Sequence, residues 1–407
     1  MSASKLQVYS SPEIDDSISK EEEHTYSPQV RSFDNNDEIE IIINQRDIWI
    51  SLFESFIQVD GEFIPDPVPE TGGGNVTLTN NAAAYLFENV SYELNNVELD
   101  SVREVGTVST IKTFLCYGKD EVRALTLAGW NDQESQQLKT FNETDNTFSF
   151  RIPLSYLLNL PFDYHRIVSG HQKLRLIRSR NDANCFISTG TRKATLKINN
   201  IELKAKHVYP NDEIKLTILE GINKDRVISL PFRKWEIHEL PSVRQTNNDI
   251  WRVKTSTQLE KPRFIIVCFQ TNRKNNPKSD VTLFDHCDVR SVRLWLNSNV
   301  YPYETWKLQF AKNKYLEAYQ AYVDFYKEFN GKDRAEPILS YTDYKKRPIF
   351  VLDCSKQNEA IRSSTIDISL EFESDNNFPA DTRAYCIIIH DRIMQYYPLT
   401  GIIRQLI

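Results

Sequence analysis

The chain has 407 residues, of which 40% are hydrophobic and 11% aromatic, so it is too long for one ordinary domain and can fill two cores of roughly 200 residues each. Its formal net charge of −7 arises within residues 1–40, where ten acidic residues accompany three basic ones, and the remainder is neutral. A neutral body argues against direct sequence-specific nucleic-acid binding through a broad basic face, although a local basic patch around Arg273, Lys274 and Lys278 is left open.

The sequence contains no stretch of 18 apolar residues, so it predicts no transmembrane segment. The first residues lack the basic-then-apolar order of a secretory signal, so we expect synthesis in the cytoplasm. Residues 1–37 are rich in Ser, Glu, Asp and Asn and show no sustained apolar period, which predicts a flexible acidic arm.

The first ordered element is expected at residues 38–44, where Ile39, Ile41 and Ile43 alternate with other residues at the period of a half-buried strand. Residues 47–61 predict a second strand that ends in the turn dipeptide Asp60-Gly61. Residues 62–80 carry three prolines and a triple glycine, and we expect a long loop there. A phosphate-binding loop is disfavoured because no Gly-Lys pair follows the glycines.

Many further short strands are separated by Asn, Asp, Gly and Pro turns, a pattern typical of β-sandwiches or barrels. They are predicted at 147–154, 173–179, 194–208, 212–221, 226–240, 248–256, 262–271, 291–297, 347–355, 364–374 and 383–397. Helical periodicity is clear in residues 312–330, where aromatic residues recur every three or four positions before Asn330-Gly331. A weaker helix is predicted within 101–118.

Two stretches about half a chain apart resemble each other. "FENVSYELNNVELD" (87–100) and "FDHCDVRSVRLWLNSNVYP" (284–302) both alternate apolar and polar residues and reach a leucine-asparagine pair, Leu94-Asn95 and Leu296-Asn297. Each is followed by one of the two predicted helices, and "FSFRIPLSYLLN" corresponds to "RPIFVLDCSKQN" at a similar spacing. The asparagines are expected to end strands, because asparagine tolerates the left-handed backbone of a turn. The repeat predicts two copies of one β-sandwich in tandem.

The pieces "TNNAAAYLFENVSYELNN" and "FRIPLSYLL", with "KPRFIIVCFQTNRKNN" and "YLEAYQAYVDFY" in the second half, resemble a double jelly-roll major capsid protein over residues 38–407. The chain is most similar to those of Polinton (Maverick) and adintovirus-like elements, in the lineage of adenovirus hexon and tectivirus coat proteins. The resemblance implies an all-β fold of two tandem eight-stranded jelly-roll β-sandwiches with a short helix in each, at 38–208 and 209–407. It also implies a structural protein of the virion whose homotrimers form pseudo-hexagonal capsomers that tile an icosahedral shell, with penton or minor capsid proteins as further partners.

Subunit contacts are then expected at Trp295, which the strand alternation places outward, and along the helix stripe of Tyr315, Tyr319, Tyr322 and Tyr326. The loop at 62–80 is a further candidate. The alternative for the tyrosines is that they dock the helix on its own sheet.

The sequence shows no catalytic motif, and its seven histidines lack metal-ligand spacing, so we expect no enzyme activity, metal or cofactor. The six cysteines are expected to be buried free thiols. Two other functions are weighed against a viral capsid. A host-domesticated capsid-derived protein would have the same sequence features. A carbohydrate-binding jelly roll would use exposed rings such as Trp295 or Trp306 to stack on a sugar.

Overall fold

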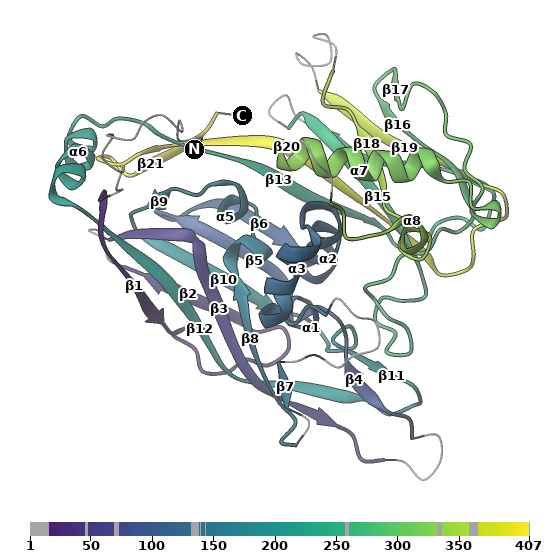
Figure 1. Cartoon of the computed structure of the whole chain (residues 1–407), viewed down its shortest axis with the longest axis horizontal. Helices are drawn as coiled ribbons and strands as arrows, with labels where there is room; N and C mark the ends of the chain where they lie inside the picture. Colours follow the sequence, from purple (N-terminus) through teal and green to yellow (C-terminus); the bar gives the residue numbers. More distant parts are fainter. Residues whose placement is uncertain are drawn as a thin grey trace, which may run out of the picture.

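The computed structural model describes residues 16–44, 48–68, 73–131, 138, 140–142, 144–256, 260–331, 336–357 and 365–406. These residues form two β-sandwiches that lie beside each other, one from each half of the chain (Figure 1). In each sandwich two antiparallel sheets enclose a core of Ile, Leu, Val and Phe side chains. The all-β prediction with two tandem sandwiches is confirmed.

The first sandwich has one sheet of order β1-β12-β3-β8-β7, with β9 paired to β3, and a second of order β2-β10-β5-β6. A small ribbon pairs β4 with β11. The bounds are β1 (Ile18–Tyr26), β2 (Glu38–Ile43), β3 (Trp49–Pro65), β4 (Val76–Leu78), β5 (Phe87–Leu94), β6 (Val97–Arg103), β7 (Phe141–Asn142), β8 (Thr147–Pro153), β9 (Ile167–Val168), β10 (Gln172–Arg178), β11 (Phe186–Ser188) and β12 (Ala194–Pro210).

The second sandwich has sheets of order β13-β20-β15-β18, with β21 paired to β20, and β14-β19-β16-β17. The bounds are β13 (Ile228–Leu240), β14 (Asn248–Ser256), β15 (Pro262–Thr271), β16 (Val289–Leu296), β17 (Asn299–Tyr301), β18 (Phe350–Asp353), β19 (Ile366–Ser374), β20 (Thr382–Tyr397) and β21 (Ile402–Gln405). These orders match β1-β12-β3-β8 and β2-β10-β5-β6 of the first sandwich place by place. The predicted internal repeat is therefore present in the strand topology.

The described helices lie between strands. They are α1 (Ala82–Tyr85), α2 (Val105–Cys116), α3 (Lys119–Ala124), η1 (Leu125–Ala128), α4 (Leu154–Leu157), α5 (Leu160–Asp163), α6 (Asp212–Asn223), η2 (Phe310–Lys312), α7 (Leu316–Asn330) and α8 (Tyr341–Tyr344). Helix α2 follows β6 and α7 follows β17, so the two longest helices of the sandwiches occupy equivalent places in the repeat. Helix α6 connects the two sandwiches.

Strand alternation explains the two corresponding strands of the repeat. In β16 the side chains of Val292, Leu294 and Leu296 are fully buried, while the intervening side chains face outward. The chain turns after β5 and after β16 at Asn95 (φ 49°) and Asn297 (φ 54°), both left-handed. The interpretation of these asparagines as turn residues is confirmed.

The expectation of a flexible arm through residue 37 is wrong for residues 18–26, which form β1 and pair with β12. The acidic run of β1 lies opposite basic side chains, with Glu21 2.7 Å from Lys206 and Glu23 3.4 Å from Arg151. The sandwich therefore starts well before residue 38. The rest of the arm up to residue 15 lies outside the described residues.

Two local predictions are also wrong. Asp60-Gly61 lies within β3 rather than at a turn, and Gly61 is there because a Cβ would come within 2.4 Å of Lys197 O and 2.5 Å of the Phe148 ring. Residues 212–221, predicted as a strand, belong to helix α6. The side chain of Asn211 accepts a hydrogen bond from Ile214 N at 2.8 Å, a helix cap that outweighs the ambiguous apolar spacing. Of the triple glycine, Gly72 lies outside the described residues.

Candidate functional site

The two sandwiches meet where α2 faces α7 (Figure 1). The Tyr322 hydroxyl of α7 donates to Phe114 O of α2 at 2.8 Å and accepts from Leu339 N at 3.2 Å. Asn330, at the end of α7, donates through Nδ2 to Cys116 O at 3.0 Å. The side chain of Tyr322 is fully buried. These bonds satisfy carbonyls of the last turn of α2 with groups from the other half of the chain.

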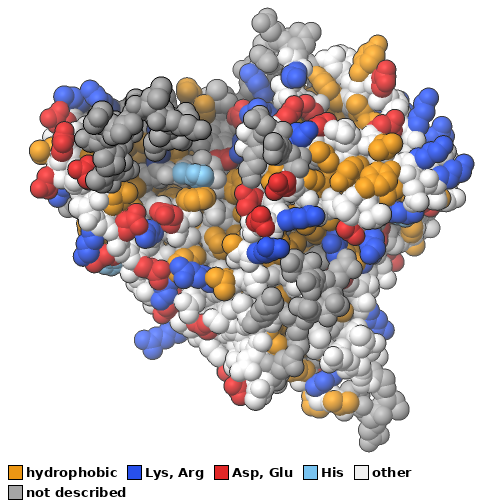
Figure 2. Space-filling model, viewed as in Figure 1, with side chains coloured by type: hydrophobic (Ala, Val, Ile, Leu, Met, Phe, Trp, Pro, Cys, Tyr) orange, Lys and Arg blue, Asp and Glu red, His pale blue; other side chains and the backbone are white. Residues whose placement is uncertain are grey.

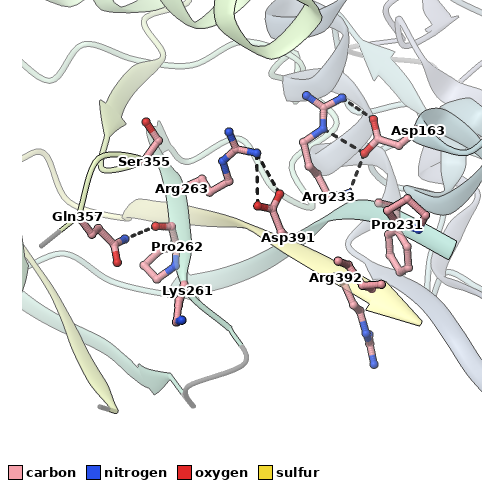
Figure 3. Close-up of a pocket in the computed structure, with 12 residues that line it drawn as sticks. Asp163, Pro231, Arg233, Lys261, Pro262, Arg263, Ser355, Gln357, Asp391 and Arg392 are labelled. Carbon is pink, nitrogen blue, oxygen red and sulfur yellow. Dashed lines mark hydrogen bonds and ion pairs between the residues drawn. The ribbon is translucent and has the colours of Figure 1, made fainter. Parts of the chain in front are cut away.

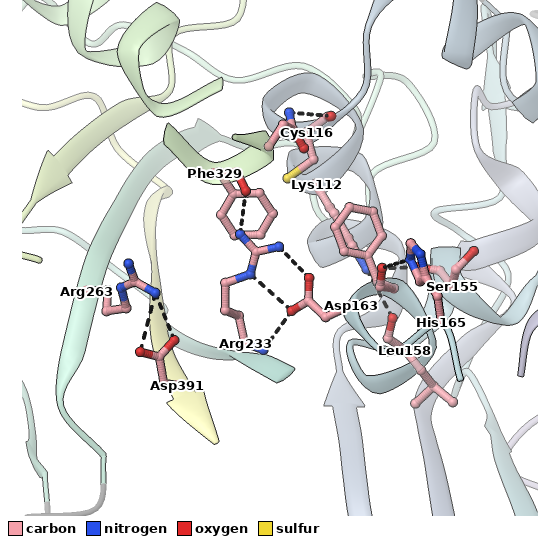
Figure 4. Close-up of polar contacts among 12 residues, drawn as sticks. Lys112, Cys116, Ser155, Leu158, Asp163, His165, Arg233, Arg263, Phe329 and Asp391 are labelled. Carbon is pink, nitrogen blue, oxygen red and sulfur yellow. Dashed lines mark hydrogen bonds and ion pairs between the residues drawn. The ribbon is translucent and has the colours of Figure 1, made fainter. Parts of the chain in front are cut away.

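An arginine-carboxylate pair joins α5 of the first sandwich to β13 of the second (Figure 4). Arg233 donates through its backbone N and through Nε to Asp163 Oδ2, at 2.7 and 3.1 Å, and its Nη2 binds Oδ1. Its Nη1 donates to Phe329 O, and the guanidinium lies 3.5 Å from the centre of the Phe329 ring. Bidentate geometry with stacking is the strong form of such a pair. Both side chains are mostly shielded from solvent, so the pair ties the sandwiches in a fixed orientation.

Behind this pair lies a buried lysine. Lys112 of α2 is 1% exposed, and its Nζ donates to Ser155 O at 2.9 Å and to Leu158 O at 3.0 Å (Figure 4). Its ammonium lies 4.0 Å from the centre of the Phe162 ring. Burial lowers the pKa of Lys112 to about 8, against the weaker attraction of neighbouring acidic groups.

A second ion-paired contact links the start of α2 to the second sandwich. Lys274 Nζ lies 2.8 Å from Glu104 of the first sandwich and 2.7 Å from Glu239 of the second. Burial works to lower the pKa of Lys274, but the two carboxylates outweigh it and hold that pKa above its ordinary value. A further polar contact, at the turn after β5, joins Asn95 Nδ2 to Gly401 O at 3.3 Å. We call this whole contact the domain junction, formed by Asn95, Glu104, Phe114, Cys116 and Asp163 of the first sandwich and Arg233, Lys274, Tyr322, Asn330 and Gly401 of the second.

The tyrosine stripe belongs to the inside of the chain. Tyr315, Tyr322 and Tyr326 are at most 2% exposed, enclosed by their own chain, whereas Tyr319 is half-buried with its hydroxyl bonded to Leu339 O at 3.2 Å. These three side chains are therefore covered within the chain, although Tyr322 contacts α2 of the first sandwich and not only the sheet of its own sandwich that the alternative interpretation named. Subunit contact through Tyr319 and Trp295 stays a prediction.

Trp295 lies on the outer face of β16, as the alternation predicts, and is half-buried. Its indole nitrogen donates to Glu371 Oε2 at 2.9 Å. On the same face Ile250 is 63% exposed in β14, opposite Glu371 in the pairing of β14 with β19. Trp306 is only 9% exposed, so its ring is not available for stacking on a sugar.

A hollow of about 710 Å³ lies beside the domain junction (Figure 3). Arg233, Lys261, Arg263 and Arg392 line it, but Arg233 is bound to Asp163 and Arg263 lies 3.0 Å from Asp391. No nucleophile with an adjacent base lines it within the described ranges. Two of its four basic side chains are therefore ion-paired within the chain.

Other chemistry is sparse in the part of the chain that the structure describes, where no three His, Cys, Asp or Glu side chains could hold a metal ion. All six cysteines are free and five are buried. Burial also raises the pKa of the half-buried thiol, Cys287, to about 12, so none is a ready nucleophile. None of the described helices is long and apolar enough to cross a membrane. Figure 2 shows basic and acidic side chains interspersed over the face of the molecule that it draws, without a broad region of one charge sign.

A family model described as the double jelly roll-like domain matches residues 76–394. The chain belongs to this family. Solved structures agree with that fold. The Faustovirus major capsid protein superposes with a TM-score of 0.62 at 10% identity, covering 95% of this chain and 92% of that chain. A structure of the Sputnik virophage gives a TM-score of 0.61 at 11% identity, covering 98% and 91%. The mavirus major capsid protein gives 0.55 at 9% identity, covering 99% and 93%.

At these identities the likeness concerns the double jelly-roll fold and not the residues of a site. No curated protein matches the chain. The domain junction was missed by the sequence reasoning because its partners are far apart in the chain, as Asp163 and Arg233 are. The aromatic face of α7 could have located part of the domain junction, because such a face must be buried against another element of the fold.

Proposed function

We propose that this double jelly-roll chain is a major capsid protein, a structural component of a virion rather than an enzyme. The observation that carries the proposal is the duplicated strand order, with the two copies held in fixed orientation by the domain junction. The three similar structures support it, since two are named major capsid proteins and the third is the Sputnik virophage.

The chain is proposed to act as a homotrimer. Three copies of two similar sandwiches present six similar sides, and such a pseudo-hexagonal capsomer can pack against neighbours to tile an icosahedral shell. Rigidity within each chain matters here, because a sandwich free to rotate against its neighbour would not keep the six-sided outline. Size-exclusion chromatography with light scattering should report three times the chain mass of 47.5 kDa. A strict monomer at every concentration would refute the proposal.

The outer face of β14 and β16 is proposed as one subunit contact. Trp295 and the exposed Ile250 lie there on the strands to either side of Glu371 in β19, and a second copy would cover them. Ile250→Asp should shift the trimer toward monomer by placing a charge in that contact. Leu127→Asp is the matched control, because Leu127 is comparably exposed, at 56%, in the other sandwich. Equal trimer stability in the two variants would remove this face from the contact.

Within the capsid proteins, we propose membership of the Polinton (Maverick) or adintovirus-like group, supported by the sequence resemblance. A working virus and a host-domesticated element would carry the same chain. Genes for a packaging ATPase, a penton-like protein or a protein-primed polymerase beside its gene would support a complete element, in which penton and minor capsid proteins are further partners. Their absence from a complete genomic neighbourhood would favour domestication.

A further inference from the structure

Strand β1 is an attached edge of the first sandwich. It pairs with β12 in antiparallel register, with Glu22 opposite His207 and His24 opposite Ala205, and none of its residues is buried. On one side of β1, Glu21 and Glu23 lie near Lys206 and Arg151. Strand β1 is therefore held by its backbone hydrogen bonds to β12 and by ion pairs on one side. The contacts of its other side complete the attachment.

That other side carries two stacked imidazoles. The rings of His24 and His207 are 4.0 Å apart between centres and 14° from parallel. The Tyr26 hydroxyl lies 3.0 Å from His207 Nε2, while His207 Nδ1 has no hydrogen-bond partner among the described residues. His207 is fully buried in β12, whereas His24 is half-buried and its Nε2 lies 3.3 Å from Glu22.

The charged groups around the pair can compensate one positive charge on the imidazoles but not two. Of the other titratable groups, Glu22 lies beside His24 and acts on His207, and the Tyr26 hydroxyl contacts His207. Lys20 and Tyr209 act in turn on Glu22. Glu22 is the one carboxylate among them, and its Oε1 contacts Lys20. On the β3 side, His207 lies opposite the apolar Ile50. Burial lowers the pKa of His207 to about 4, and His24 adds to that shift while Glu22 opposes it.

We propose that the His24–His207 stack is an acid-sensitive clasp that releases β1 from β12. In the attached state the two rings stack. When both carry a proton, two cations face each other at 4.0 Å, and a charged His207 is buried with an unpartnered Nδ1–H. Separation of β1 exposes both rings to water and relieves both costs.

The sign follows from linkage. A histidine with a lowered pKa in the attached state favours attachment fully above its free pKa of about 6.5, and loses that contribution as the pH falls toward about 4. Release therefore takes place between these two values. It leaves the edge of β12 with unpaired backbone groups, which another strand can join. In the proposed capsid, acid would thus loosen this edge of the first sandwich.

Hydrogen exchange read by mass spectrometry on the full chain tests the clasp, with rates corrected for the intrinsic effect of pH. Between pH 7 and pH 4.5 the protection of β1 amides should fall about 50-fold, while that of β14 stays unchanged, because β14 is an edge strand of the second sandwich and neither it nor its partner β19 contains a histidine. The double variant His24→Gln, His207→Gln should keep its β1 protection, and His165→Gln is the control that should behave like wild type.

Two results would overturn the clasp. One is unchanged β1 protection in the wild type at pH 4.5. The other is an equal loss in the double variant, which would assign the effect to protonation of Glu21 and Glu23 at their ion pairs. A thermal melt of the double variant at pH 7 checks that it folds, and His24→Gln alone serves if it does not. The assay reads one chain, so its outcome is independent of whether the protein forms a capsid.

Discussion

Removing one buried hydroxyl from the domain junction should cost far more stability than its size implies. Tyr322→Phe keeps the ring and its packing but removes Oη, which donates to Phe114 O and accepts from Leu339 N. Both groups are then left unpaired in a fully buried site. A buried unpaired polar group costs about 1–3 kcal/mol, so the two together should lower the free energy of unfolding by about 2–6 kcal/mol.

Two tyrosines in the same chain provide matched controls. Tyr319→Phe removes one half-buried hydrogen bond, to Leu339 O at 3.2 Å, and should cost about 1 kcal/mol. Tyr303 is 96% exposed, so Tyr303→Phe should change stability by less than about 0.5 kcal/mol. Urea unfolding followed by tryptophan fluorescence and by circular dichroism measures all three. If Tyr322→Phe costs no more than Tyr303→Phe, the hydroxyl does not join the two sandwiches as described.

Three further predictions concern the junction and the sheets. Asp163→Asn should weaken the clamp on Arg233 and split thermal unfolding, followed by calorimetry, into two transitions, whereas a single unchanged transition would show that the clamp is dispensable. Between pH 8 and 10.4 the wild type should lose stability in urea titrations, because the buried thiols ionise first in the unfolded chain. Folded Lys112 opposes this loss, because it gives up its proton before the unfolded chain does, so Lys112→Met should lose up to about 3 kcal/mol more than the wild type over the same range. Gly61→Ala should lower the melting temperature through overpacking against β12, and Gly221→Ala, with 4.0 Å to its nearest atom in helix α6, should not.

The sequence predicted the architecture because each half carries the same physical pattern. Period-two burial along β16 and a left-handed asparagine after both β5 and β16 are local requirements, and they are legible without knowing the fold. Strand β1 was missed because its acidic run is typical of a disordered arm, and the partners that stabilise it, β12 with Lys206 and the side chain of Arg151, lie far away in the sequence. Helix α6 was missed because Ile214, Leu216 and Ile218 suit either period.

The tyrosine stripe shows a limit of a different kind. Its spacing correctly predicted a helix with one covered face, but a pattern in one segment cannot name the surface that covers it. Here Tyr322 finds its partner in Phe114, 208 positions away, on the equivalent helix of the other sandwich. Equivalent helices of the two repeats, α2 and α7, therefore form the centre of the domain junction.

This use of the helices constrains any assembly. Because α2 and α7 pack against each other, their facing sides are buried within the chain and cannot contact another subunit. The two turn asparagines have diverged accordingly. Both accept a backbone N–H of their own sandwich through Oδ1, Asn95 from His171 at 3.1 Å and Asn297 from Asp367 at 2.8 Å. They differ at Nδ2, which donates to Gly401 O across the junction in Asn95 and to Thr365 O of its own sandwich in Asn297. Contacts between copies must therefore use surfaces that the junction leaves open, such as the outer face of β14 and β16, and those surfaces differ between the two sandwiches. A trimer built this way would look six-sided while alternating two chemically distinct kinds of edge.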